Sequence, residues 1–217
     1  MKQENNLYFF GREIATRSLV PKVKVYDEKV MIKGRDHFRV WDPEKSKLGA
    51  AFTKGLKNTF FKDGSKVLYL GIASGTSASH VSDIIGNKGI IYGIEFASRP
   101  LRDLMLVCRK RKNIIPMLAD ARLPDTYANK IEKVDIIFQD IAQRDQADIF
   151  LNNMDLFLKS GGIGLIAIKA KCIDVTKKVR QVFREQKEHI NTKYKVIQEI
   201  PLAPYELDHT LFVVRRK

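Results

Sequence analysis

The strongest constraint on this chain is a regular alternation of two kinds of segment that begins near residue 66. Short runs rich in β-branched residues occupy 66–70, 89–94, 113–118, 134–138 and 163–169. Segments with helical character separate them, at 77–85, 99–111, 143–158 and 174–190. Strands that alternate with helices of this length form βαβ units, in which a parallel sheet is covered on both faces. The sequence therefore predicts an α/β domain.

The C-terminal end departs from this alternation. Strand-like runs at 194–200 and 209–216 are joined by PLAPYELD without a helix between them. We expect the two runs to pair antiparallel at one edge of the sheet, with the last run beside the fifth strand.

The N-terminal end departs from it as well. Apolar and polar residues alternate around Asp27 and Glu28, which predicts a hairpin. A further strand is expected at 37–41, before a turn at a proline and a helix. We therefore predict a small antiparallel β annex over residues 1–45 and a main α/β domain over residues 46–217.

Composition bounds the class of protein. The chain has 217 residues, of which 44% are hydrophobic and 29% are charged, as in soluble globular proteins. The first ten residues lack the apolar core of a signal peptide, and no apolar run approaches the roughly 20 residues that cross a bilayer. Cys108 and Cys172 lie far apart and the four histidines are scattered. We expect reduced thiols, no metal site, no membrane contact and a cytoplasmic location.

The net charge of +14 is spread over the whole chain. A phosphate-rich partner such as RNA would favour this charge. A highly charged soluble surface would explain it equally well, so charge alone leaves both interpretations open.

A glycine-containing turn follows the first strand of the main domain, in the sequence VLYLGIASGTSASHVSDIIG. A P-loop would need a lysine after its last glycine, and the dinucleotide fingerprint would need Gly-x-Gly-x-x-Gly; this chain has neither. A loosened loop suits a ligand that contains adenosine without a pyrophosphate, namely S-adenosylmethionine. We expect Gly71, Ala73 and Gly75 to lie against it.

Acidic residues follow the next three strands. Glu95 ends the second strand, where a carboxylate binds ribose hydroxyls in nucleoside-binding α/β folds, and Phe96 offers a flat face to the adenine. Asp120 and Ala121 follow the third strand and should meet the adenine edge, and Asp140 follows the fourth. Each carboxylate could instead be a helix cap, but three in register favour a methyltransferase site. The predicted fold class is a Rossmann-like class I S-adenosylmethionine-dependent methyltransferase sheet with an antiparallel C-terminal edge hairpin and the N-terminal β annex.

Two lysines accompany Asp140. Lys169 ends an apolar strand, where a lysine is costly unless it is used or paired, and Lys47 starts the helix that precedes the glycine turn. A ribose hydroxyl needs a base as it attacks a methyl group, and a lysine becomes a base when burial and a second cation lower its pKa. Lys47, Asp140 and Lys169 form the predicted catalytic set, with His209 as a fourth candidate. A structural Lys–Asp pair and a loop histidine remain the alternatives.

These segments together resemble fibrillarin, the methyltransferase family of box C/D ribonucleoproteins. The segments that carry the resemblance are FRVWDPEKSKLGAA, VLYLGIASGTSASHVSDIIG, IYGIEFASRPLRDL, RKNIIPMLADAR, VDIIFQDIAQRDQADIF, IAIKAKCID and PYELDHTLFVV. The Gly/Arg-rich start of eukaryotic members is missing, so the resemblance is to the archaeal form. It implies guide-RNA-directed ribose 2′-O-methylation of ribosomal RNA, and of transfer RNA in some organisms.

The resemblance also implies partners and contacts. The partners would be a box C/D guide RNA, the substrate RNA, a Nop-domain scaffold protein and a kink-turn-binding ribosomal-protein-like subunit. Its cofactor contacts fall on residues already named and on further ones in the two loops: Thr76, Ser77, Glu95, Phe96, Asp120, Ala121, Asp140, Ile141, Ala142 and Gln143. Its catalytic set falls on Lys47, Asp140, Lys169 and His209.

Other functions compete with this one. A stand-alone methyltransferase could act on RNA, on protein glutamine or on a small molecule, although a small-molecule enzyme does not need a charge of +14. A non-catalytic RNA-binding subunit is disfavoured because all three members of the lysine–aspartate–lysine set are present.

Overall fold

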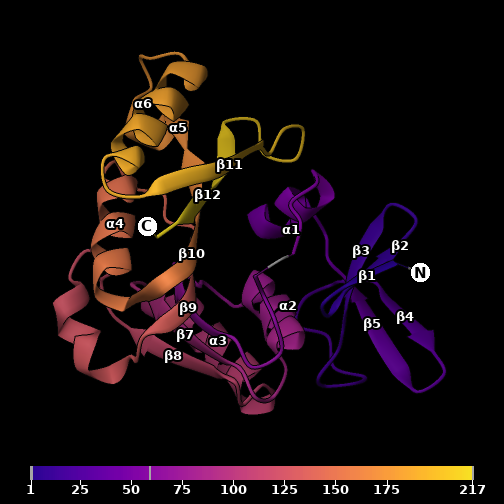
Figure 1. The fold of residues 1–217 in the computed structure, drawn as a ribbon. Coiled ribbons are helices and arrows are strands. Elements are labelled where there is room, and N and C mark those ends of the chain that lie inside the picture. The colour runs from indigo at the N-terminus through magenta and orange to yellow at the C-terminus, as the bar shows by residue number, and fades with distance from the viewer. Residues whose placement is uncertain (1, 59, 217) are drawn as a thin grey trace.

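The computed structural model describes residues 2–58 and 60–216, and in this part of the chain the strands form two sheets, of five and seven strands (Figure 1). The smaller sheet is the N-terminal annex and is antiparallel throughout, in the order β1-β2-β3-β5-β4. Its strands are β1 (Lys2–Glu4), β2 (Leu7–Phe10), β3 (Glu13–Arg17), β4 (Val30–Lys33) and β5 (Asp36–Val40). The sequence did not predict the first three of these strands individually.

The hairpin predicted around Asp27 and Glu28 is wrong. The chain turns instead between β4 and β5, where Lys33 pairs with Asp36 and Gly34 has a left-handed φ of 59°. The Glu28 carboxylate accepts the backbone N–H groups of two residues just before it and is 3% exposed. This local bonding satisfies the backbone without a strand ladder, which is why the alternating pattern misled.

The larger sheet has the strand order β11-β12-β10-β9-β6-β7-β8. Its strands are β6 (Lys66–Leu70), β7 (Ile90–Glu95), β8 (Ile114–Leu118), β9 (Val134–Gln139), β10 (Leu158–Lys169), β11 (Lys195–Pro201) and β12 (His209–Arg215). The first five are parallel, β12 is antiparallel to β10, and β11 is antiparallel to β12 at the edge. The predicted parallel sheet with a C-terminal edge hairpin is confirmed.

Helices cover both faces of this sheet (Figure 1). They are α1 (Lys47–Thr53), α2 (Thr76–Ile85), α3 (Ser98–Lys110), the 3-10 helix η1 (Pro124–Lys130), α4 (Gln146–Phe157), α5 (Ala170–Ile173) and α6 (Val179–Asn191). Alternate residues of β6 pack in the two hydrophobic cores on opposite faces of the sheet. Val67 and Tyr69 pack on the α2 side, while Leu68 and Leu70 pack on the α4 side. The helix expected from residue 174 starts later, because the Asp174 side chain bonds the backbone two residues on and forms a turn.

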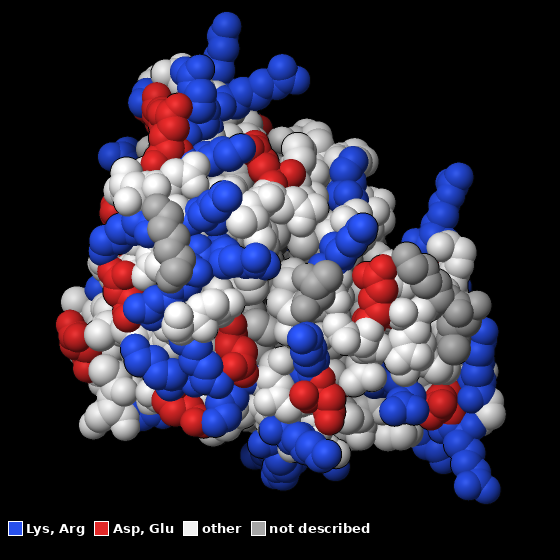
Figure 2. Space-filling view, viewed as in Figure 1, with Lys and Arg blue, Asp and Glu red and all other residues white. Residues whose placement is uncertain are grey.

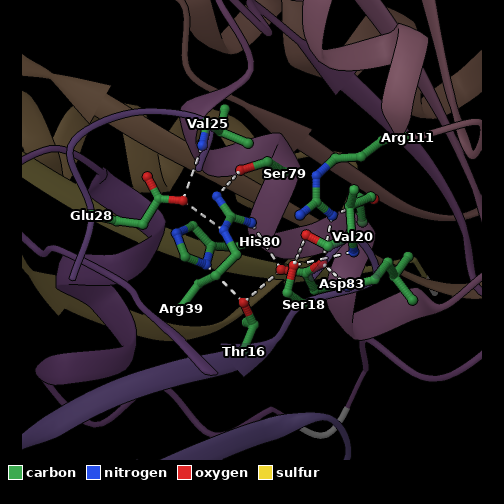
Figure 3. A network of polar contacts seen from close by, with 12 residues as sticks. Thr16, Ser18, Val20, Val25, Glu28, Arg39, Ser79, His80, Asp83 and Arg111 are labelled. Atoms are coloured by element: carbon green, nitrogen blue, oxygen red, sulfur yellow. Dashed lines mark hydrogen bonds and ion pairs between the residues drawn. The ribbon is translucent and has the colours of Figure 1, made fainter. Parts of the chain in front are cut away.

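Buried charges join the annex to α2 (Figure 3). Arg39 of β5 is 1% exposed; it pairs with Glu28 at 2.7 Å and with Asp83 of α2 at 2.8 Å, and it also donates to the Ser79 hydroxyl. Arg111, just after α3, pairs with the second oxygen of Asp83. Charges buried this deeply are stable only when paired, so this network fixes the annex against the α/β domain.

A buried histidine adds to this junction. His80 of α2 is fully buried and contacts Thr16 through Nδ1 and Tyr26 through Nε2, both at 2.8 Å. Its ring stacks on Trp41 at 4.7 Å between centroids. Burial lowers the pKa of His80 well below its usual value, with nearby Arg39 acting in the same direction. A neutral ring therefore links the annex to α2 near neutral pH.

The strand order creates a switch point between β6 and β9: β7 and β8 follow on one side of β6, whereas β9 and β10 lie on its other side. The two loops that leave these strands touch: a Cβ on Gly71 would lie 2.5 Å from the backbone oxygen of Asp140. Gly71 also has a φ of 75°, so both space and backbone conformation require glycine. Within the described chain, no helix is long and apolar enough to cross a membrane.

Candidate active site

A cavity of about 280 Å³ lies at the carboxyl ends of the parallel strands, at the switch point. The loops that follow β6, β7, β8 and β9 form it. Predicted cofactor residues that line it are Gly71, Ala73, Glu95, Phe96, Asp120, Ala121, Asp140, Ile141, Ala142 and Gln143. The three acidic residues are therefore brought to one cavity, as expected for strands that end at the same edge.

Glu95 organises two of these loops. Its carboxylate accepts the backbone N–H of Ala73 at 2.9 Å and that of Ala97 at 2.8 Å. Ala73 has an unusual left-handed φ of 51°, and its bond to Glu95 stabilises this conformation. The carboxylate thus holds the glycine turn in place and also begins the turn into α3.

The third loop presents a charged pair and an apolar floor. Asp120 forms an ion pair with Arg122 at 2.6 Å, and the side-chain bond from Arg122 lowers the pKa of Asp120. Ala121 is 6% exposed, while Phe96, which lines the same cavity, is 70% exposed. The cavity thus offers a flat ligand both an exposed aromatic ring and a loop whose carboxylate is ionised.

Three predicted contacts lie outside the cavity lining. Gly75 caps α2 with a φ of 91°, and a Cβ there would lie 2.7 Å from Leu104 of α3. Thr76 lines a neighbouring cavity between α3 and the annex. The Ser77 hydroxyl lies 2.7 Å from that of Ser46. A cofactor role for these three residues stays a prediction.

Lys47 and Asp140 meet across the cavity edge, with Lys47 Nζ 3.2 Å from Asp140 Oδ2. The side chain of Ser46 caps α1 by accepting the N–H of Gly49, which fixes the helix end that carries Lys47. Burial raises the pKa of Asp140, and the ammonium group of Lys47 opposes that rise. Residues 93 positions apart in sequence are thus in direct contact.

Lys169 and His209 are cross-strand neighbours on β10 and β12. The Lys169 backbone is held on both sides by Gln146 of α4, whose side chain accepts its N–H at 3.0 Å and donates to its carbonyl. Within residues 2–58 and 60–216, no hydrogen bond or ion pair of the Lys169 ammonium group is found. This amine is the least restrained member of the predicted set.

His209 is 5% exposed, and burial lowers its pKa to about 4. The ring is therefore neutral near pH 7. In the described part of the chain neither ring nitrogen has a hydrogen-bond partner, although a carboxylate oxygen of Glu206 lies 3.3 Å from Nδ1.

Some residues at this site were missed by the sequence analysis. Gln139 and Gln146 are fully buried and join the ends of β9 and β10 to α4. A polar residue at the end of the apolar run before Asp140 was a usable signal for Gln139. Glu206 contacts both Lys47 and His209, and no local signal points to it because its position depends on how the β11–β12 loop folds. In the part of the chain that the structure describes, no cluster of His, Cys, Asp and Glu could hold a metal.

Comparison with known proteins agrees with this geometry. The family model described as Fibrillarin matches residues 2–217. The chain belongs to the fibrillarin family. The predicted family resemblance is therefore confirmed, over nearly the full length.

Individual members of the fibrillarin family are similar in sequence and structure. The fibrillarin-like rRNA/tRNA 2′-O-methyltransferase of Pyrococcus abyssi is 52% identical over 95% of this chain and 91% of its own length. Aeropyrum pernix fibrillarin, solved with natively bound S-adenosyl-L-methionine, has a TM-score of 0.86 and 44% identity, covering 93% of this chain and 88% of that one. The fibrillarin of a fibrillarin/Nop5p complex has a TM-score of 0.91 and 37% identity, with 100% of both chains covered. The predicted methyltransferase fold class is confirmed by these matches.

Proposed function

We propose that this protein is the catalytic subunit of a box C/D ribonucleoprotein, in which a guide RNA selects the ribose that is methylated. The protein is an S-adenosylmethionine-dependent RNA 2′-O-methyltransferase that acts on ribosomal and transfer RNA. The observation that carries the proposal is the contact of Lys47 with Asp140 at the mouth of the cavity, next to Lys169.

The cavity suits S-adenosylmethionine on chemical grounds. Glu95 offers carboxylate oxygens for ribose hydroxyls, and Phe96 and Ala121 offer apolar faces for the adenine. Because Gly71 has no side chain, the backbone of its loop can lie directly against that of Asp140 at the switch point. We propose Gly75, Thr76 and Ser77 as further contacts near the start of α2, through small shifts of that loop on binding.

The catalytic groups divide the work of proton removal and charge stabilisation. When bound, S-adenosylmethionine supplies an electrophilic methyl group on a sulfonium. Lys169 is the proposed base: its amine accepts the proton of the ribose 2′-hydroxyl as that oxygen takes up the methyl group. Asp140 holds the side chain of Lys47 in place through their ion pair. His209 is neutral and completes the polar floor behind Lys169.

Site selection requires more than this chain. The annex is a small antiparallel sheet, and on the face shown in Figure 2 Lys and Arg are spread among Asp and Glu. A diffuse positive surface attracts phosphates without reading bases. We propose that base pairing to a box C/D guide supplies the choice, with a Nop-domain scaffold and a kink-turn-binding ribosomal-protein-like subunit holding the guide. The fibrillarin/Nop5p complex supports the scaffold partner. Because these RNAs are made inside the cell, we place the protein in the cytoplasm.

A guide-shift experiment tests this proposal. The purified chain with S-adenosylmethionine should give little site-specific methylation of bare RNA, and adding the guide and both partner proteins should restore methylation at one nucleotide. Re-pairing the guide by one nucleotide should move the methyl group by one nucleotide. Methylation of a defined ribose by the protein alone would instead support a stand-alone enzyme.

A second experiment tests the base. Lys169→Ala should leave affinity for S-adenosylmethionine nearly unchanged, while methyl transfer in the assembled complex falls by roughly 10²–10⁴-fold, as for a lost general base. Lys171→Ala is a matched control, because its ammonium pairs with Asp208 at the surface. A Lys169→Ala enzyme that turns over near the wild-type rate would show that the base lies elsewhere.

A further inference from the structure

The loop between β11 and β12 carries a carboxylate that touches two groups of the proposed catalytic set. One oxygen of Glu206 lies 3.7 Å from Lys47 Nζ, and the other lies 3.3 Å from His209 Nδ1. Lys47 belongs to α1 and His209 to β12, so a single side chain connects elements that are distant in sequence. We propose that Glu206 is a positioning residue for the methyl-transfer reaction, and this inference rests on the proposed function.

The loop is held firmly enough to position a side chain. Its start is bonded to β12 through the N–H of Leu202 and the carbonyl of His209, at 3.1 Å. Its end is bonded to α5, where the N–H of Ala170 donates to the carbonyl of Asp208 at 3.0 Å. Leu202 is fully buried in the core on the α2 side. Glu206 therefore extends from a loop fixed at both ends, and its side chain is 33% exposed.

The first role of Glu206 concerns Lys47. With Asp140 at 3.2 Å and Glu206 at 3.7 Å, the ammonium group lies between two carboxylates. Two fixed anions restrict a long side chain that a single contact would leave free to rotate. The negative charge of Glu206 also adds to the rise in the pKa of Asp140. Glu206 thus helps to hold the Lys47 side chain in place.

The second role concerns the proton of His209. Glu206 makes no hydrogen bond to this ring, but its negative charge lies 3.3 Å from Nδ1 and favours the neutral tautomer with the proton on that nitrogen. Nε2 is then left as the nitrogen with the free lone pair. The charged groups around this ring are Lys47 of α1, Lys169 of β10, and Glu206 and Asp208 of the β11–β12 loop. Glu206 is the carboxylate that lies next to Nδ1.

Glu206→Gln tests the inference, because it removes the charge and keeps the shape. In the assembled complex the single-turnover rate should fall about tenfold, the low end expected for a charged contact at a partly exposed site. The KM for S-adenosylmethionine should not change, since Glu206 does not line the cofactor cavity. Glu199→Gln is the control: this β11 carboxylate pairs with Lys187 at the surface and should leave the rate unchanged.

Two readouts separate positioning from a general structural effect. If Glu206 acts through Lys47, Glu206→Gln should add less than about twofold to the loss caused by Lys47→Ala. In addition, ¹⁵N NMR of the isolated protein should show His209 moving from the Nδ1–H tautomer toward Nε2–H in Glu206→Gln. Equal rate losses in both backgrounds, an unchanged rate, or an unchanged tautomer would overturn the inference. An inactive wild-type complex would instead count against the proposed function, and the tautomer measurement would still decide the role of Glu206.

Discussion

Gly71 gives a direct test of how the switch point is built. Its φ of 75° lies in the left-handed region, and a Cβ there would lie 2.5 Å from the backbone oxygen of Asp140. Gly161 has nearly the same φ, 72°, but a Cβ there would meet nothing within 4 Å. Replacing each glycine by alanine therefore separates backbone strain from the close approach of the two loops.

The expected magnitudes follow from these two geometries. Gly161→Ala carries only the left-handed strain, about 1–2 kcal/mol of unfolding free energy. Gly71→Ala carries the same strain and must also push a backbone carbonyl aside, which adds about 1–3 kcal/mol, as overpacking does. We expect a total of about 2–5 kcal/mol at Gly71. Any relief of the contact moves the peptide of Asp140, so affinity for S-adenosylmethionine should fall as well.

Urea unfolding of the two variants and the wild type measures the difference, with the slope of each transition checked for equality. Calorimetric titration with S-adenosylmethionine measures the second effect, and Gly161→Ala should bind like the wild type because Gly161 lies away from the cofactor cavity. Equal destabilisation by the two substitutions would refute the argument that contact between the β6 and β9 loops, rather than φ alone, requires glycine at 71.

The remaining predictions use other parts of the structure. Glu95→Ala should weaken binding of S-adenosylmethionine by about 10- to 100-fold in calorimetry, because a charge-assisted contact and the support of the glycine turn are lost together; undiminished binding would contradict the assignment. Arg39→Met should lower the unfolding free energy by about 3–5 kcal/mol, since it leaves buried Glu28 without its ion-pair partner and Asp83 with Arg111 alone. Arg17→Met, which breaks an exposed pair, should cost about 1 kcal/mol or less, and similar values for the two would refute the role of the buried network. Because the pKa of His209 is lowered to about 4, this histidine is protonated in the unfolded chain but stays neutral in the folded chain as pH falls from 6.5 to 4. His209 should therefore remove on the order of 3 kcal/mol of the stability present above pH 6.5 across that window, in addition to the loss from His80, and His209→Asn should make the slope less steep; an identical slope would show that His209 does not contribute.

Sequence analysis succeeded where the signal is local. The alternation of apolar strands with helices depends on short-range hydrophobic patterns, and it predicted each strand of the larger sheet within a residue or two, except for the early start of β10. Since parallel strands end at one edge, the residues that follow them were expected in a common crevice. Glu95, Asp120 and Asp140 do line one cavity.

Local patterns failed where side chains bond to the backbone or to distant partners. Glu28 looked like a hairpin turn residue, yet it caps its own loop and pairs with Arg39 inside the protein. Arg111 lies in the basic run 109–112, where its neighbours in sequence are charged, yet it is 3% exposed because Asp83 lies against it. The ion-pair partners of Glu28 and Arg111 lie in other elements, and the local sequence around neither residue predicts its partner.

The sequence by itself determined the fold class, the edge at which the site lies and the residue types available there. Tertiary structure decided which of those residues meet. Lys47 reaches Asp140 only because α1 packs against β12 and the annex strand β3, and Glu206 reaches both Lys47 and His209 only because of the way the β11–β12 loop folds. Hydrophobic periodicity is read over a few residues, whereas these distances depend on strand order and helix packing, which combine the whole chain.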